Sequence, residues 1–137
     1  MSDIVRFGVS IEKKVLKEFD RYIKQKSYPT RSKAIGDLIR DCLVKKEWIE
    51  GREVAGAITM VYDHHKRKLL NRLTDVQHKF HNIIVSSQHI YLDRDNCLEI
   101  VVVRGRPKEV LRLSDSLKAT KGLKHSSLVC ETTGEKI

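Results

Sequence analysis

A chain of 137 residues, 40% of them hydrophobic, is long enough for one ordinary domain or two small ones with packed cores. No apolar stretch approaches the roughly 20 residues that span a bilayer, and the start MSDIVRFGVS lacks a basic region followed by a long apolar run, so we expect a cytoplasmic protein with no membrane partner. The three cysteines have no CxxC spacing, which argues against a disulfide framework.

Positive charge is concentrated near the N-terminus. The formal net charge is +9, and residues 1–46 hold twelve Lys or Arg against six Asp or Glu, which leaves +3 for the rest of the chain. A basic segment of this kind suits a polyanionic partner, although net charge alone equally suits a basic protein that binds none.

Residues 6–48 predict a short strand and two helices. In the RFGVSI segment, side chains alternate with the period of a strand that has one buried face. The apolar positions are Phe7, Val9 and Ile11, and the outward positions are Arg6, Gly8 and Ser10. Apolar residues at helical spacing then predict a helix over 12–26 and, after a break at SYPT, a second helix to about Trp48, with Thr30 placed to cap it.

So small a module cannot bury its own apolar surface, and its strand has two open hydrogen-bonding edges. Two copies would solve both problems by pairing their strands antiparallel and interlocking their helices beneath the ribbon. A two-stranded ribbon fits the major groove of double-stranded DNA.

The pattern over residues 3 to about 48 resembles the ribbon-helix-helix DNA-binding family, most specifically in RFGVSI and YPTRSKAIGDLIRD. The resemblance implies that Arg6 and Ser10 reach base edges, while Gly8 stands where the family usually has a hydrogen-bonding side chain. It also implies that the start of the second helix, formed by Thr30, Arg31 and Ser32, holds a phosphate. The alternative is a basic amphipathic unit used only for dimerisation.

The later residues predict a βαββαβ domain after a polar linker, IEGREVAG. The expected elements are strands at 57–64, 83–92, 97–104 and 123–131 and helices at 66–81 and 107–122. The fold class is therefore α+β, with a ribbon-helix-helix module at 1–50 and a ferredoxin-like domain at 51–137. In that domain both helices cover one face of a four-stranded antiparallel sheet.

Candidate metal ligands gather on the hairpin that joins the middle strands. His89 and Tyr91 point to one side of their strand. A five-residue connection over 92–96 would pair Tyr91 with Cys97. It would also pair His89 with Glu99 and bring all four side chains to one face, whereas a four-residue loop would put the thiol on the other face. We expect the five-residue connection or an equivalent bulge.

The alternative is that His89 and Tyr91 are solvent-exposed residues of an ordinary strand and that Cys97 is a small buried hydrophobic residue. His78 lies about opposite the apolar stripe of its helix, so it could complete a site only by meeting another subunit. Imidazole with thiolate suits nickel, copper and zinc, and suits calcium or magnesium poorly.

The whole chain resembles the nickel-responsive transcriptional regulators, through its order of modules and through VYDHH, VQH and HxYxDxxNCLE. The resemblance implies one nickel ion per subunit, held across a subunit interface. The implied ligands are His78 of one chain and His89, residue 91 and Cys97 of another, with Glu99 as a supporting carboxylate. It further implies a homotetramer, a dimer of dimers with an ACT-like second domain, which represses at palindromic DNA half-sites when metal is bound.

Two positions depart from that family. Tyr91 replaces a histidine, and its phenol is mostly protonated near pH 7. A three-ligand site with water would suit zinc or a looser nickel site, copper is possible, and His64 and His81 are conceivable substitutes. Lys33 replaces an acidic residue that, with an aspartate matched by Asp37, holds a hard cation between the modules. We expect the Lys33 ammonium to replace that cation by pairing with Asp37 or with a carboxylate of the sheet domain.

Two other functions remain open. The same scaffold could sense a small molecule or nothing after loss of the metal site, or the chain could be an antitoxin whose second module masks a toxin. An enzyme is not expected, because no oxyanion loop or glycine-rich phosphate cradle accompanies the Cys/His pair.

Overall fold

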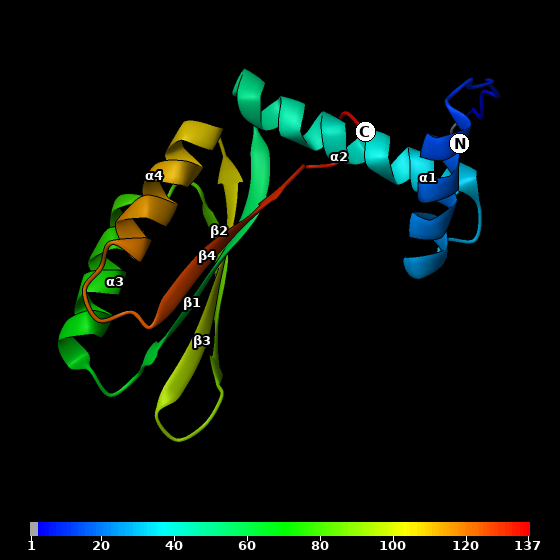
Figure 1. Cartoon of the computed structure of the whole chain (residues 1–137). Coiled ribbons are helices and arrows are strands. Elements are labelled where there is room, and N and C mark those ends of the chain that lie inside the picture. The colour runs from blue at the N-terminus through cyan, green and yellow to red at the C-terminus, as the bar shows by residue number, and fades with distance from the viewer. Residues whose placement is uncertain (1–2) are drawn as a thin grey trace. The chain divides into compact units, whose positions relative to one another are not determined.

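The computed structural model describes residues 3–137. Its elements, labelled in Figure 1, are α1 (Lys13–Gln25), α2 (Arg31–Glu50), β1 (Val54–Asp63), α3 (Arg67–Lys79), β2 (Ile84–Tyr91), β3 (Asn96–Gly105), α4 (Pro107–Lys118) and β4 (His125–Glu131). The contacts divide the chain into two compact units, one that ends at Asp41 and one that covers Cys42–Ile137. Within the described range, no helix is both long and apolar enough to cross a membrane.

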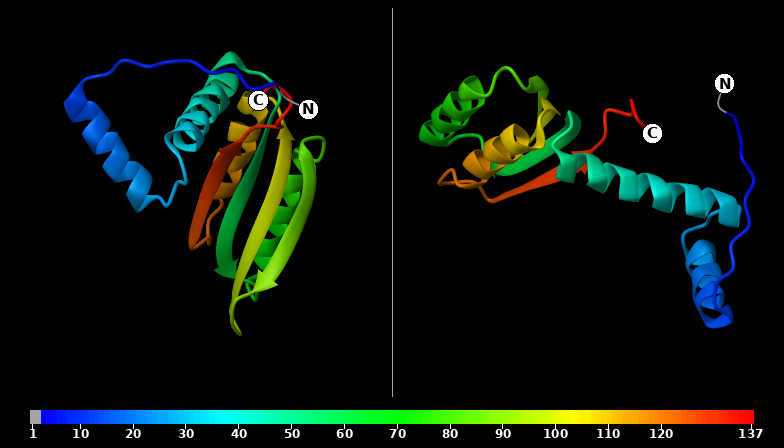
Figure 2. Two further views of the ribbon diagram at one scale, coloured as in Figure 1. Left: turned by 90° about the vertical axis from the view of Figure 1, so that its right-hand side faces the viewer. Right: turned by 90° about the horizontal axis from the view of Figure 1, so that it is seen from above.

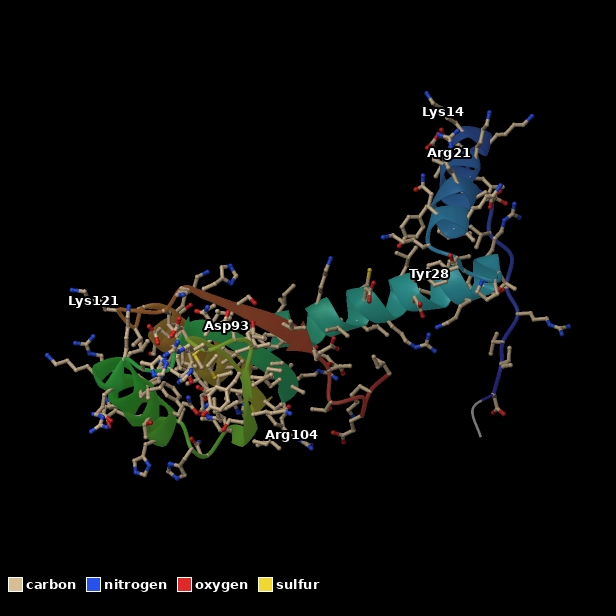
Figure 3. All side chains as sticks on the ribbon, turned by 90° about the horizontal axis from the view of Figure 1, so that it is seen from below. Lys14, Arg21, Tyr28, Asp93, Arg104 and Lys121 are labelled. Atoms are coloured by element: carbon tan, nitrogen blue, oxygen red, sulfur yellow. The ribbon has the colours of Figure 1, made fainter. Side chains whose placement is uncertain are left out.

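The first unit contains α1 and the beginning of α2. Arg31 joins the two helices, because its Nε and Nη2 atoms each donate a hydrogen bond of 2.8 Å to the carboxylate of Asp20. Thr30 Oγ1 accepts a hydrogen bond of 3.1 Å from the backbone nitrogen of Lys33, which confirms the predicted cap of α2. Figure 3 shows Lys14 and Arg21 extending away from the α1 ribbon.

The strand predicted over RFGVSI is absent from this single chain, where residues 3–12 form neither helix nor strand. The physical reason is that a strand needs a hydrogen-bonding neighbour, and these residues have none within one chain. Phe7, Val9 and Ile11 are consequently 68%, 60% and 48% exposed. The prediction thus depends on a second copy to supply the pairing strand.

The second unit contains the predicted βαββαβ arrangement of elements. Its four strands lie in the order β2-β3-β1-β4, and every neighbouring pair is antiparallel. Helices α3 and α4 cover one face of this sheet (Figure 1), and the strands lie side by side in the left view of Figure 2. The ferredoxin-like arrangement expected from the sequence is therefore confirmed.

The core lies between the sheet and these two helices. Along β1, buried and half-buried residues alternate, as the pleat of a strand with one covered face requires. The core side chains from the sheet are Val54, Ile58, Met60, Tyr62, Cys97, Val101 and Val103, and those from the helices are Leu69, Leu73, Val110, Leu113 and Leu117. The hairpin that carries the candidate ligands is thus built on a packed scaffold.

Some element boundaries differ from the prediction. β1 begins at Val54, within the segment expected to be a linker, and includes Gly56. A Cβ on Gly56 would lie 3.0 Å from the backbone oxygen of Val129, so this glycine allows β1 and β4 to approach closely. α4 ends at Lys118, before Gly122, which has a φ of +108° and cannot continue a helix.

Candidate metal site

The β2–β3 hairpin has the five-residue connection that the sequence predicts. Tyr91 pairs with Cys97, and His89 pairs with Glu99. Residues 92–96 form the connection, which is closed by a hydrogen bond of 2.9 Å from the nitrogen of Leu92 to the oxygen of Asn96. This register brings His89, Tyr91, Cys97 and Glu99 to the face covered by the helices.

Asp93 holds the turn of this hairpin. Its Oδ1 atom accepts hydrogen bonds from the backbone nitrogens of Asp95 (2.9 Å) and Asn96 (2.8 Å), and the side chain of Asn96 also donates to its carboxylate. These bonds, those from Asn96 foremost, lower the pKa of Asp93 to about 2. The charged carboxylate therefore fixes the residue that directly precedes Cys97.

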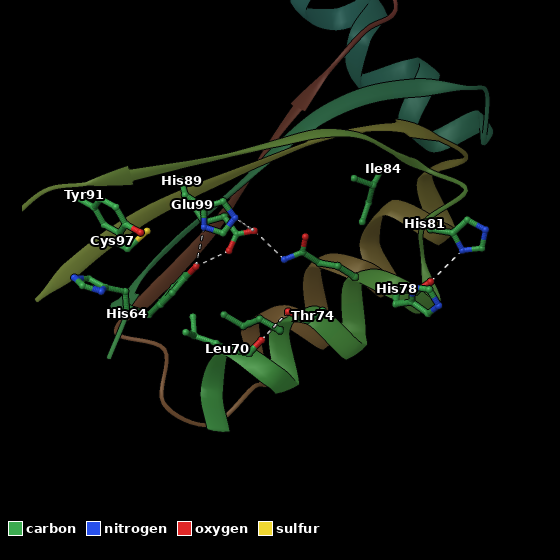
Figure 4. Close-up of a pocket in the computed structure, with 13 residues that line it drawn as sticks. His64, Leu70, Thr74, His78, His81, Ile84, His89, Tyr91, Cys97 and Glu99 are labelled. Atoms are coloured by element: carbon green, nitrogen blue, oxygen red, sulfur yellow. Dashed lines mark hydrogen bonds and ion pairs between the residues drawn. The ribbon is translucent and has the colours of Figure 1, made fainter. Parts of the chain in front are cut away.

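The candidate ligands differ in burial because they lie on different strands. Cys97 and Glu99 are 1% and 2% exposed on β3, which lies between β1 and β2. His89 and Tyr91 lie on the edge strand β2, where the His89 side chain is 52% exposed and Tyr91 is 70% exposed. Tyr91 and Cys97 lie beside each other in Figure 4. The candidate site is therefore buried on the β3 side and exposed to solvent on the β2 side.

Glu99 is the centre of a buried hydrogen-bond network. Tyr62 Oη donates to Glu99 Oε1 at 2.7 Å, and Gln77 Nε2 donates to Glu99 Oε2 at 2.9 Å. His89 approaches the same groups, with Nε2 3.6 Å from Glu99 Oε2 and Nδ1 3.4 Å from Tyr62 Oη. Burial and the bond to Glu99 raise the pKa of Tyr62, so its hydroxyl stays protonated and remains a donor.

Tyr62 and Gln77 are part of this site but were not among the site residues predicted from the sequence. Both belong to segments that carry the family resemblance, VYDHH and VQH, in which only the histidines were candidate ligands. The alternation along β1 could have revealed Tyr62, because it lies on the buried face and pairs with Cys97 across the sheet. For Gln77 the sequence contains no comparable signal, because its bond to Glu99 depends on how α3 packs against the sheet.

His78 is exposed near the C-terminal end of α3, with its ring centroid 6.0 Å from that of His81. His81 is fixed in this place by a contact of 3.0 Å between its Nδ1 atom and the backbone oxygen of His78. Both histidines line the same cavity of about 650 Å³ as His89 and Cys97. In Figure 4 they lie at the far end of that cavity from Cys97.

Across residues 3–137, no three His, Cys, Asp or Glu side chains lie close enough together to hold a metal ion. The hairpin brings His89, Tyr91 and Cys97 to one face, and it leaves His78 apart from them. The donor types still fit a late first-row metal, because a thiol and an imidazole stand on a rigid sheet with a buried carboxylate behind them.

A second pair of histidines adjoins the hairpin. The ring of His64 lies 4.8 Å from that of Tyr91 and 4.0 Å from that of His65, measured between centroids. The Nε2 atoms of His64 and His65 lie 2.8 Å and 3.1 Å from the backbone oxygen of Arg94. His64 also lines the cavity, whereas His65 is an exposed neighbour.

The residues predicted to contact DNA belong to the first unit. Arg6, Gly8 and Ser10 are exposed, and Thr30 and Ser32 stand at the start of α2. In this chain the guanidinium of Arg31 is bound to Asp20, and the hydroxyl of Thr30 caps its own helix. The binding of DNA by these six residues remains a prediction.

The inter-module pair predicted at the start of α2 forms an ion pair within that helix. Lys33 Nζ lies 2.7 Å from Asp37 Oδ1, and Arg40 Nη1 lies 3.5 Å from the same atom. Hydrogen bonds from Lys33 and then Tyr28 lower the pKa of Asp37. Its carboxylate is therefore surrounded by donors of this chain.

Comparison with known proteins identifies the second unit. Residues 55–130 match the family model of the NikR C-terminal nickel-binding domain. A solved structure of an uncharacterized protein from Thermotoga maritima is similar with a TM-score of 0.52 and 15% sequence identity, and it covers 58% of this chain and 98% of that chain. At that identity the structural likeness supports only the fold.

Two relatives extend the similarity to the whole chain. One, from Syntrophus aciditrophicus and provisionally named a nickel-responsive regulator, is 59% identical over 98% of this chain and 98% of its own length. Another, from Chlorobaculum tepidum and named in the same way, is 53% identical over 93% of this chain and 96% of its own. The chain belongs to the family of nickel-responsive regulators.

Proposed function

We propose that this protein is a cytoplasmic transcription regulator that binds nickel and, with nickel bound, represses transcription at palindromic DNA sites. The observation that carries the proposal is the register of the hairpin. It places His89 and Cys97 on one face, in front of the buried Glu99. Thiolate and imidazole ligands suit nickel, and the hydrogen-bonded carboxylate would hold a ligating imidazole in position.

The proposed nickel site is shared between subunits. His78 is exposed and stands apart from its own hairpin, so it is free to meet the hairpin of a second copy. The ligands would then be His78 from one subunit and His89 and Cys97 from another, with one ion per subunit. At the fourth position this chain has Tyr91, where the family resemblance implies a histidine.

The proposed DNA-binding module is a dimer of first units. Apolar side chains that should form the core of such a dimer are exposed in the single chain, including Phe7, Val9, Val15 and Leu38. The net +6 charge of residues 1–46 would favour binding to the phosphate backbone. The outward residues of the paired strands, Arg6 and Ser10 among them, would contact bases.

The sheet face opposite α3 and α4 supports assembly into a tetramer. Ile90, Val102 and Val129 lie on that face and are 37%, 37% and 49% exposed. Apolar side chains in the open face of an antiparallel sheet favour packing against another subunit. Two ribbon dimers would thus be joined through their sheet domains.

Metal and DNA binding would be coupled through the arrangement of the subunits. Because the ligands come from two subunits, binding of nickel favours one spacing and tilt of the two ribbon modules. If that spacing matches two half-sites, the affinity for DNA rises, and by linkage DNA raises the affinity for nickel equally.

The test is a titration of the full-length protein with nickel, zinc and copper. Thiolate-to-metal charge-transfer absorption would report ligation by Cys97, and selection from a palindromic DNA library would report the operator. We expect nickel to produce the absorption band and to be required for tight DNA binding. Absence of metal binding by the wild type would refute the proposal.

A regulator of the same kind that prefers zinc or copper is the second candidate, favoured by the phenol of Tyr91 in place of an imidazole. The same titration separates the metals. Family membership supports a regulator over an enzyme, and the complete sheet domain makes an antitoxin the weaker alternative.

A further inference from the structure

We propose that His64 supplies the imidazole ligand that residue 91 lacks in this chain. This inference rests on the proposed function, and it names a histidine outside the ligand set that the family resemblance implies. The observation behind it is the position of the His64 ring, 4.8 Å from the ring of Tyr91. An imidazole therefore stands beside the place where the family carries one.

The backbone brings His64 to the hairpin from β1. Tyr62 pairs with Cys97 across the sheet, and the chain continues beyond the end of β1 to His64, whose nitrogen donates to the oxygen of Asp95 at 3.0 Å. His64, two residues beyond the buried Tyr62, therefore lies beside the turn of the hairpin. It is half-buried and borders the same cavity as His89 and Cys97 (Figure 4).

The hydrogen bonding of His64 leaves one ring nitrogen available for a metal. A carbonyl oxygen can only accept, so the 2.8 Å contact with Arg94 makes Nε2 of His64 the protonated nitrogen. In a neutral imidazole the other nitrogen, Nδ1, then keeps its lone pair. A metal-binding histidine commonly has one N–H bonded to a backbone carbonyl, which fixes the tautomer and orients the ring.

The neighbouring side chains are less suited to this position. Tyr91 is 70% exposed and offers a phenol in place of an imidazole. His65 shares the Arg94 acceptor, at 3.1 Å, but is an exposed residue outside the cavity lining. His81 lies beside His78, away from Cys97.

In the single chain His64, His89 and Cys97 do not yet converge, so nickel binding must bring the His64 ring closer to the thiolate. The hydrogen bond to Arg94 is kept if the hairpin turn, which carries that carbonyl, moves together with His64. The complete set would then be His64, His89 and Cys97 from one subunit and His78 from another. Three imidazoles and one thiolate suit four-coordinate nickel without a phenolate.

The experiment compares nickel binding by the full-length wild type with that by His64→Ala, His65→Ala, His81→Ala and Tyr91→Phe. X-ray absorption at the nickel edge counts the imidazole ligands, and competition with a chelator gives the affinity. We expect His64→Ala to lose one imidazole and at least ~100-fold in affinity, above the 10–100-fold typical of groups that only orient a ligand. His65→Ala is the matched control, because it removes the adjacent imidazole that shares the same carbonyl.

The double variant His64→Ala/Tyr91→His tests the same inference by rescue, since it places an imidazole at residue 91. We expect it to regain the lost ligand and most of the affinity. Nickel binding by the wild type that His64→Ala leaves unchanged would overturn this inference and leave the proposed function standing. Loss of an imidazole in His81→Ala instead, or loss of affinity in Tyr91→Phe, would also overturn it, whereas a wild type that binds no nickel would end both proposals.

Discussion

Glu99 places a carboxylate inside the sheet domain with 2% of its surface exposed. Burying a charge is costly unless hydrogen bonds replace the lost water, and here Tyr62 and Gln77 donate one bond to each oxygen. His89, which approaches the same carboxylate at 3.6 Å, thereby gains a fixed neighbour. The packing of the core and the position of a candidate ligand thus depend on the same side chain.

We expect Tyr62→Phe to destabilise the sheet domain and to weaken nickel binding. It keeps the ring in the core but removes the donor to Glu99 Oε1, which should lower the free energy of unfolding by about 1–3 kcal/mol. Looser positioning of His89 should reduce nickel affinity by roughly 10–100-fold. Urea unfolding and nickel titration measure the two effects, with Tyr22→Phe as a control on an exposed ring. Full nickel affinity in Tyr62→Phe would mean that the network does not position His89.

The Asp20–Arg31 pair predicts a pH dependence of the first unit. The hydrogen bond from Arg31 lowers the pKa of Asp20 below its usual 3.8. Because the folded state has the lower pKa, the pair stabilises the unit fully above the unfolded pKa, and this contribution is lost as the pH falls through the folded value. We expect contact between α1 and α2 to weaken below about pH 4.

An NMR titration of the Asp20 carboxyl and of amides in α1 would show this effect. Asp20→Asn should abolish the part of the acid transition that involves α1. An unshifted Asp20 titration would show that the pair does not persist in solution.

At the scale of the helix, α2 has the ammonium of Lys33 beside Asp37, where the family resemblance implies a bound metal cation. Lys33 Nζ lies 2.7 Å from Asp37 Oδ1. We therefore expect DNA binding by the wild type to be independent of potassium, and Lys33→Ala to weaken metal-dependent DNA binding. Fluorescence anisotropy with labelled operator, in potassium and in a bulky organic cation, measures both.

Lys46→Ala is the matched control, because it removes another lysine of α2 that pairs with an acidic residue four positions on, Glu50, at 3.7 Å. A wild type whose DNA affinity required potassium would contradict the idea. So would a Lys33→Ala variant that binds DNA as tightly as the wild type.

At the scale of the whole molecule, each unit leaves apolar surface that a second copy could cover. In the first unit this surface includes the side chains of Phe7 and Val9, and in the second it is the open face of the sheet. The two surfaces are separate, so one could be disrupted while the other persists. This separation makes the proposed assembly testable.

We expect Val9→Lys to prevent ribbon pairing, because it places a charge in the apolar face of the predicted strand. The proposed tetramer should fall to a dimer held by the sheet domains, DNA binding should be lost, and nickel binding should persist. Light scattering after gel filtration, together with nickel and DNA titrations, measures the three properties. Gly8→Ser, on the outward face, is the control and should keep the assembly. An intact Val9→Lys tetramer would place the dimer contact elsewhere.

Local sequence patterns predicted much of this protein. Alternation and helical spacing identified the elements of the sheet domain. The five-residue connection over 92–96, expected because it brings the candidate ligands to one face, pairs Tyr91 with Cys97 as predicted. The start of β1 was wrongly predicted to be a linker, because a glycine such as Gly56 is typical of loops, whereas here it allows β4 to approach closely. The N-terminal strand was predicted from its alternation, but pairing needs a neighbour that one chain does not provide.

The sequence by itself determined the order of elements and the identity of the candidate ligands, and it predicted the common face of His89 and Cys97 for a five-residue connection, which the structure has. The first two properties follow from side-chain period and residue type, which are local. Only the tertiary structure decided that Tyr62 and Gln77 bind Glu99, across 37 and 22 residues of sequence, and that His64 stands beside Tyr91. Such contacts depend on how strands and helices pack, and no periodicity within a single segment encodes that packing.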